Sequence, residues 1–158
     1  PVSGIALGSA TIAPVNMANA YATIANGGQA ATVHVVDKVT DADGKVLYQR
    51  KQRTEDAIDE DVAADTSYAL QQVVSSGTGT AALALGRPAA GKTGTATNAD
   101  DDVSSSWFVG YTPQLATAVM YVRGKGNEAL DGWLPDYNGV SGYFGANYPA
   151  RTWTAVMT

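Results

Sequence analysis

The fold is decided by Ala90-Gly91-Lys92-Thr93-Gly94-Thr95-Ala96-Thr97. Its threonines are β-branched and its other residues are mostly small, so we expect residues 89–97 to form a strand whose backbone is open to contact. On a strand, the side chains of Lys92 and Thr93 start on opposite faces. The edge of such a strand can pair with an extended peptide, and hydroxyl groups can hold the peptide's carboxylate. The stretch therefore predicts a peptide-binding strand.

The same lysine also completes a phosphate-binding loop pattern of glycine, four residues and Gly-Lys-Thr over residues 86–93. Such a loop opens a helix, because the helix N-terminus binds the phosphate. Here Gly94 and the following threonines disfavour a helix, and Pro88 removes one backbone N–H from the loop. A nucleotide-binding site is therefore the less favoured alternative.

The composition is that of an ordinary globular chain, with 158 residues, 45% of them hydrophobic and 16% charged. The formal net charge of −5 argues against a nucleic-acid partner, which needs a basic face. The sequence contains no cysteine, so disulfides and cysteine metal sites are excluded. It shows no apolar run near the ~18 residues of a membrane span. We expect neither a cofactor nor a metal site.

The remaining patterns predict an α+β chain with an antiparallel sheet. A turn between two strands is expected at Asp41-Ala42-Asp43-Gly44, since Asp-Gly supplies the positive φ of a tight hairpin. Residues 51–65 are expected on the surface or leading into a helix, and residues 124–148 in loops. The expected helices are Ile12–Asn26, Ala64–Ser76 (capped by Asp65 or Thr66) and Tyr148–Met157, and the expected strands are Val33–Val39, Lys45–Tyr48, Ala89–Thr97, Ser106–Tyr111 and Ala116–Arg123.

Several other residues are of types found in catalytic, metal-binding or ligand-binding sites, but we expect each of them to have a structural role. The single histidine, His34, lies in an apolar run and is expected to pack rather than to catalyse. Residues 98–102 carry acids but lack the glycine and glutamate of a calcium loop, so we expect a solvated turn. Core or sheet-face positions are expected for Trp107, Phe108 and Tyr111. Four aromatic residues lie in the glycine-rich stretch before the last helix, and we expect them to pack within their loop; the alternative is that they line the rim of a groove. They are Trp133, Tyr137, Tyr143 and Phe144.

Several segments, taken in order, resemble the class A (bifunctional) penicillin-binding proteins along nearly the whole chain. Lys-Thr-Gly is one of the elements of that family, but the ordered set is far more specific than the tripeptide. The segments that carry the resemblance are Ala6–Ser9, Pro14–Gly28, Gly77–Gly79, Gly86–Thr95, Trp107–Pro113, Tyr148–Trp153 and Met157.

The resemblance implies the serine transpeptidase/β-lactamase fold, an antiparallel sheet covered by helices, which is incomplete in this chain. It implies a serine-type D,D-transpeptidase or carboxypeptidase that acts on the D-Ala-D-Ala end of peptidoglycan stem peptides through an acyl-enzyme. β-Lactam antibiotics mimic that end and trap the serine. The implied location is the bacterial cell surface, on the periplasmic side of the cytoplasmic membrane, with an anchor in an upstream segment.

The resemblance also implies roles for residues 92–95 of the expected peptide-binding strand. Lys92 would set a positive potential and hydrogen-bond toward the serine of the family's second motif. Thr93 and Thr95 would bind the substrate carboxylate, and the backbone N–H of Thr95 would be half of the oxyanion hole. Gly94 would keep the strand open to the substrate.

The family's first two motifs, Ser-x-x-Lys and Ser-x-Asn, do not occur in the sequence. We therefore expect residues 1–158 to be the C-terminal portion of the domain, inactive alone, with the nucleophile in an upstream half. The alternative is a non-catalytic or truncated homologue that binds peptidoglycan or a partner without chemistry. The serines that fail both patterns are Ser3, Ser9, Ser67, Ser75, Ser76, Ser104, Ser105, Ser106 and Ser141.

Overall fold

A three-stranded antiparallel sheet forms the centre of the protein in a computed structural model that describes residues 8, 10–133, 135–137, 139–140 and 142–158. The strands are β5 (Ala90–Thr97), β6 (Val103–Thr112) and β7 (Leu115–Val122), in the order β5-β6-β7. The strands expected at Ala89–Thr97, Ser106–Tyr111 and Ala116–Arg123 are thus confirmed. Of the segments that carried the family resemblance, Ala6, Leu7 and Ser9 lie outside the described residues, as do Ser3 and Ser141.

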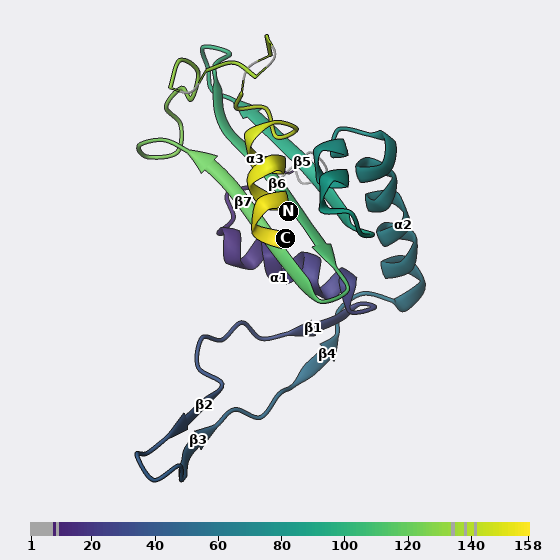
Figure 1. Cartoon of the computed structure of the whole chain (residues 1–158), viewed down its shortest axis with the longest axis vertical. Coiled ribbons are helices and arrows are strands. Elements are labelled where there is room, and N and C mark those ends of the chain that lie inside the picture. Colours follow the sequence, from purple (N-terminus) through teal and green to yellow (C-terminus); the bar gives the residue numbers. More distant parts are fainter. Residues whose placement is uncertain (1–7, 9, 134, 138, 141) are drawn as a thin grey trace.

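Helices cover both faces of this sheet (Figure 1). The helix α1 (Pro14–Ala25) packs on β6 and β7 from one side, and α3 (Tyr148–Met157) packs on the same strands from the other. The helix α2 (Glu60–Ser76) lies along β5, and a short 3₁₀ helix, η2 (Thr80–Leu85), leads from α2 back to that strand. The result is an α+β fold with helices on an antiparallel sheet, as expected.

The core between the sheet and α3 is centred on two aromatic side chains, Phe108 and Trp153, which have no solvent-exposed surface. Their rings meet edge to face with centroids 5.1 Å apart. The indole N–H of Trp153 donates to the carbonyls of Gly110 (3.3 Å) and Thr117 (3.1 Å), which ties α3 to β6 and β7. On the α1 side, the aromatic ring of Tyr111 is also buried. Core positions are confirmed for Phe108 and Tyr111.

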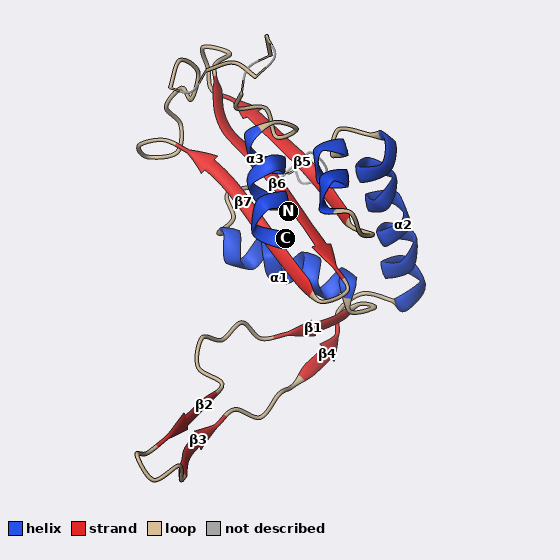
Figure 2. Cartoon of the chain, in the orientation of Figure 1, coloured by secondary structure: helices blue, strands red, loops and turns tan. Residues whose placement is uncertain are grey.

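An arm made of residues 29–56 projects from one end of the sheet (Figure 2). At its base β1 (Gln29–Ala31) pairs with β4 (Thr54–Asp56), and at its tip β2 (Lys38–Thr40) pairs with β3 (Val46–Gln49). The turn at Asp41 is confirmed, because its carboxylate accepts hydrogen bonds from the backbone N–H groups of Asp43 and Lys45.

The prediction of a strand over Val33–Val39 is wrong for most of its length, because only its last two residues lie in β2. The valines of this run project from the arm; Val35, for example, is 97% exposed. An apolar run predicts a strand only if a neighbouring layer covers it, and the described residues provide none here. The strand β4, within the stretch expected to be surface, was not predicted.

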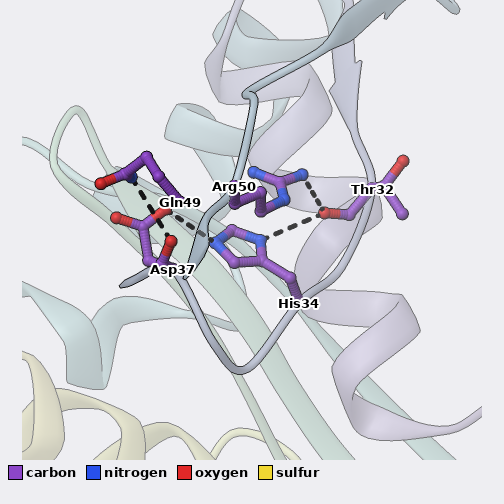
Figure 3. A network of polar contacts seen from close by, with 5 residues as sticks. All are labelled: Thr32, His34, Asp37, Gln49 and Arg50. Atoms are coloured by element: carbon purple, nitrogen blue, oxygen red, sulfur yellow. Dashed lines mark hydrogen bonds and ion pairs between the residues drawn. The ribbon is translucent and has the colours of Figure 1, made fainter. Parts of the chain in front are cut away.

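His34 lies in the arm and takes part in a polar network rather than in a core (Figure 3). Its Nδ1 lies 3.3 Å from the carbonyl of Thr32, which also accepts a hydrogen bond from Arg50 (2.9 Å). Its Nε2 lies 3.9 Å from the Asp37 carboxylate, and the carbonyl of Asp37 accepts a hydrogen bond from Gln49 (3.4 Å). The prediction that His34 packs in an apolar strand is therefore wrong.

The helix expected at Ala64–Ser76 begins one turn earlier than predicted. Asp59 precedes its first residue, and Glu60 and Asp61 place negative charge in the first turn, where the helix dipole favours it. The predicted caps are wrong, because Thr66 lies inside the helix and its hydroxyl donates to the carbonyl of Val62 (2.7 Å). The other two expected helices agree with α1 and α3 to within two residues at either end.

Candidate active-site strand

The Lys-Thr-Gly-Thr segment occupies the middle four positions of the eight-residue strand β5. In the antiparallel register with β6, Lys92 is opposite Val109, Thr93 opposite Phe108, and Thr95 opposite Ser106. Within the described part of the chain β5 is an edge strand, with β6 on one side and no strand on the other. An unpaired strand edge is the kind of surface to which an extended peptide can add as a further strand.

Lys92 is exposed, and its ammonium group contacts the next residue of the strand. Its Nζ donates to the carbonyl of Thr93 (3.0 Å) and to the Thr93 hydroxyl (3.3 Å). Lys92 and Thr93 leave the strand on opposite faces, but the flexible lysine stem brings the charge to the hydroxyl. The structure thus places a positive charge beside a hydroxyl group at an open strand edge.

A second hydroxyl, from a segment that sequence reasoning did not assign to the site, meets Thr93. The Oγ1 of Thr78 lies 2.7 Å from the Oγ1 of Thr93. Thr78 follows α2 in a turn whose flanking glycines pack tightly on that helix. A Cβ on Gly77 would lie 2.9 Å from Val73 Cα, and one on Gly79 would lie 3.1 Å from the Val73 carbonyl oxygen. Larger residues would displace this turn from β5.

Thr95 is held by a loop that returns from far along the chain. The backbone N–H of Gly145 donates to the Thr95 hydroxyl (3.1 Å). Gly145 lies directly on the sheet backbone, since a Cβ there would be 2.5 Å from the carbonyl oxygen of Trp107 and 2.7 Å from that of Gly94. Only a glycine allows the loop to approach the strand this closely.

The aromatic residues of the loop between β7 and α3 divide into two groups. Tyr143 is buried and packs in a cluster with Val103 and Leu130, as loop packing predicts. Trp133 is 64% exposed, and the Arg123 guanidinium lies 4.4 Å from its ring centroid. The guanidinium of Arg151 lies over the ring of Tyr137 in a similar cation–π contact, 3.9 Å from the ring centroid. Phe144 is partly exposed and precedes Gly145, so it is the aromatic residue nearest in sequence to the Thr95 contact.

Two alternative sites are not supported. The segment of the phosphate-binding pattern runs into β5 instead of opening a helix, so it lacks the helix N-terminus that binds phosphate. Residues 98–102 form a turn in which the Asn98 side chain accepts from the N–H groups of Asp100 (2.9 Å) and Asp102 (3.1 Å), as expected. No group of three potential metal-ligating side chains occurs among the described residues.

Sequence reasoning missed both partners of the two threonines, Thr78 and Gly145. The glycine pair around Thr78 was part of the family resemblance, so a signal for a special backbone position existed. Nothing local distinguishes Gly145 from the other glycines of its loop, because its contact partner is fifty residues away in sequence.

The family model for the penicillin-binding protein transpeptidase domain matches residues 2–132. Penicillin-binding protein 1A of Mycolicibacterium smegmatis is 36% identical over 99% of this chain, and that of Neisseria gonorrhoeae is 42% identical over 73%. The chain spans 20% and 15% of the lengths of these two relatives. In the part of the chain that the structure describes, no helix is long and apolar enough to cross a membrane.

Solved structures agree with this assignment. The PonA1 protein from Mycobacterium tuberculosis, determined in complex with penicillin V, superimposes with a TM-score of 0.84 at 35% identity, covering 99% of this chain and 40% of that one. Penicillin-binding protein 1A from Haemophilus influenzae has a TM-score of 0.78 at 20% identity and supports the fold alone. The chain belongs to the penicillin-binding protein transpeptidase family.

Proposed function

We propose that this chain supplies the substrate-binding strand of a peptidoglycan D,D-transpeptidase that works through a serine acyl-enzyme. The observation that carries the proposal is the arrangement at the open edge of β5. There, the Lys92 ammonium lies 3.3 Å from the Thr93 hydroxyl, and the Thr95 hydroxyl lies two residues further on the same strand face. A cation beside two hydroxyls fits the carboxylate of a D-Ala-D-Ala end or of a β-lactam.

In this proposal each residue of the strand has one role. Lys92 attracts the carboxylate, and Thr93 and Thr95 donate hydrogen bonds to it. The backbone N–H of Thr95 is one donor of the oxyanion hole, a contribution of about 3 kcal/mol to transition-state stabilisation for a typical donor. Gly94 keeps the substrate's approach to the backbone free. These roles come from matching this strand to the family's third motif.

The nucleophilic serine and its base are proposed to lie in a segment that precedes Pro1 in the full-length protein. None of the serines in this sequence has the family's Ser-x-x-Lys or Ser-x-Asn spacing, and an unactivated hydroxyl is a poor nucleophile. The chain alone is therefore proposed to be inactive. The full-length protein would act on stem peptides at the periplasmic side of the cytoplasmic membrane, held there by an upstream anchor.

Covalent labelling with a fluorescent penicillin tests the proposal. The full-length protein should be labelled and the 158-residue chain should not. Replacing Lys92 by methionine, which keeps the stem but removes the charge, should slow labelling about 10- to 100-fold, as for loss of a hydrogen bond to a charged group. A full-length protein that takes up no label would refute the proposal.

A non-catalytic homologue remains the second candidate, because the chain lacks the first two motifs. It predicts that the encoding gene has no Ser-x-x-Lys segment upstream of Pro1. It further predicts binding of peptidoglycan without any acyl-enzyme. Reading the upstream sequence therefore separates the two candidates.

A further inference from the structure

The hydroxyl of Thr93 has two polar neighbours, and they restrict where its single proton can point. The Nζ of Lys92, at 3.3 Å, can only donate. The Oγ1 of Thr78, at 2.7 Å, can either donate or accept. If Thr93 donates to Thr78, its proton is used and no donor remains for a ligand. If Thr78 donates to Thr93, both lone pairs of Thr93 are used and its proton must point to a third group.

The turn that carries Thr78 is positioned independently of the strand. The N–H groups of both Gly77 (3.1 Å) and Gly79 (2.9 Å) donate to the carbonyl of Val73, which fixes the turn to the end of α2. Gly79 is buried, and a Cβ there would lie 3.2 Å from the Phe108 ring. Phe108 is also the residue opposite Thr93 in the sheet, so the turn and Thr93 lie near the same buried ring.

We propose that Thr78 is a positioning residue that donates a hydrogen bond to the Thr93 hydroxyl and so directs the Thr93 proton toward the carboxylate of the substrate or β-lactam. This inference rests on the proposed function, which gives Thr93 its role, and it adds a residue outside the Lys-Thr-Gly strand. Thr78 itself touches no substrate. It acts by holding the rotamer and the polarity of Thr93.

The test compares benzylpenicillin, which has the carboxylate, with its methyl ester, which does not. Second-order acylation rate constants are measured on the full-length protein by competition with a fluorescent penicillin. The wild-type protein should favour the acid over the ester. Thr78→Val, which keeps the shape but removes the donor, should lower this preference about 3- to 10-fold, the range for one neutral hydrogen bond. Thr78→Ser should restore it.

The control variants separate a role of Thr78 in carboxylate binding from a purely structural role. Thr93→Val should lose the preference at least as fully as Thr78→Val, and Thr78→Ala replaces the valine variant if that variant has a lowered melting temperature. A merely structural link between the α2 turn and β5 would slow acylation by acid and ester alike. An unchanged acid-to-ester ratio in Thr78→Val, or a ratio lowered equally by Thr78→Ser, overturns the inference. Absence of acylation of the wild-type protein by either compound instead refutes the proposed function.

Discussion

Replacing Gly145 by alanine should damage the site by displacing Thr95 rather than by unfolding the protein. The added Cβ would lie 2.5 Å from the carbonyl oxygen of Trp107 and 2.7 Å from that of Gly94, and both are backbone atoms that cannot rotate away. An ordinary contact begins near 3.4 Å, so the loop must withdraw by roughly 1 Å to relieve the overpacking.

This withdrawal breaks the bond between the loop and the strand. The Gly145 N–H lies 3.1 Å from the Thr95 hydroxyl, so a shift of roughly 1 Å takes it beyond hydrogen-bonding distance. We expect a stability loss of about 1–3 kcal/mol from the overpacking. We expect the acylation rate constant to fall about 10- to 100-fold, since a misplacement of this size at a binding group has such effects.

The assay is the second-order rate constant for labelling of the full-length protein by a fluorescent penicillin, with a thermal melt of each variant. Gly139→Ala is the matched control, because it lies in the same loop and its Cβ would meet no atom within 4 Å. That control carries only the strain of a positive φ (+76°), about 1 kcal/mol. Acylation of Gly145→Ala at the rate of Gly139→Ala would refute the coupling of the loop to Thr95.

The remaining predictions concern the core, the tyrosines and the arm. Trp153→Ala should lower the free energy of unfolding, measured by urea denaturation, by about 3–5 kcal/mol. Val156→Ala, on the exposed side of the same helix, should change it by no more than about 0.5 kcal/mol. Similar losses in the two variants would contradict the burial of Trp153. Burial and the facing Tyr111 raise the pKa of Tyr21 above its ordinary value of 10.0. Because the folded state then holds the phenol proton more tightly than the unfolded state, this contribution to stability is complete below pH 10 and is lost as the pH rises further. Tyr21→Phe should therefore reduce the alkaline fall in stability seen by urea denaturation, and an unchanged profile would argue against the burial of this phenol. Backbone amides of β2 and β3, whose residues are all exposed, should exchange with deuterium well before those of β6; equal protection would show that something covers the arm.

The sheet and two of its core residues were predictable because their signals are local. Threonines and small residues mark β5, and β-branched and aromatic residues mark β6 and β7. Phe108 and Tyr111 lie on opposite faces of β6, and both faces are covered by helices, so both residues are buried. A run of β-branched and aromatic residues such as β6 favours a strand over a helix or a loop.

The arm and the contacts of the site were not predictable in the same way. The valines around Val35 form an apolar run that nothing covers in the described structure, so the assumption that apolar residues are buried fails there. Thr78 and Gly145 reach β5 from positions 15 and 50 residues away from the threonines they contact. Such long-range pairs depend on how the helices and loops pack on the sheet, and no local pattern encodes them.

A structure of the full-length protein acylated by a penicillin would show whether β5 binds the carboxylate. We expect the carboxylate of the bound penicillin to lie within hydrogen-bonding distance of the hydroxyls of Thr93 and Thr95. We also expect the acyl carbonyl oxygen to face the backbone N–H of Thr95 and the acylated serine to precede Pro1. An acyl-enzyme whose carboxylate lies away from β5, or whose acylated serine lies within residues 1–158, would contradict the proposed function.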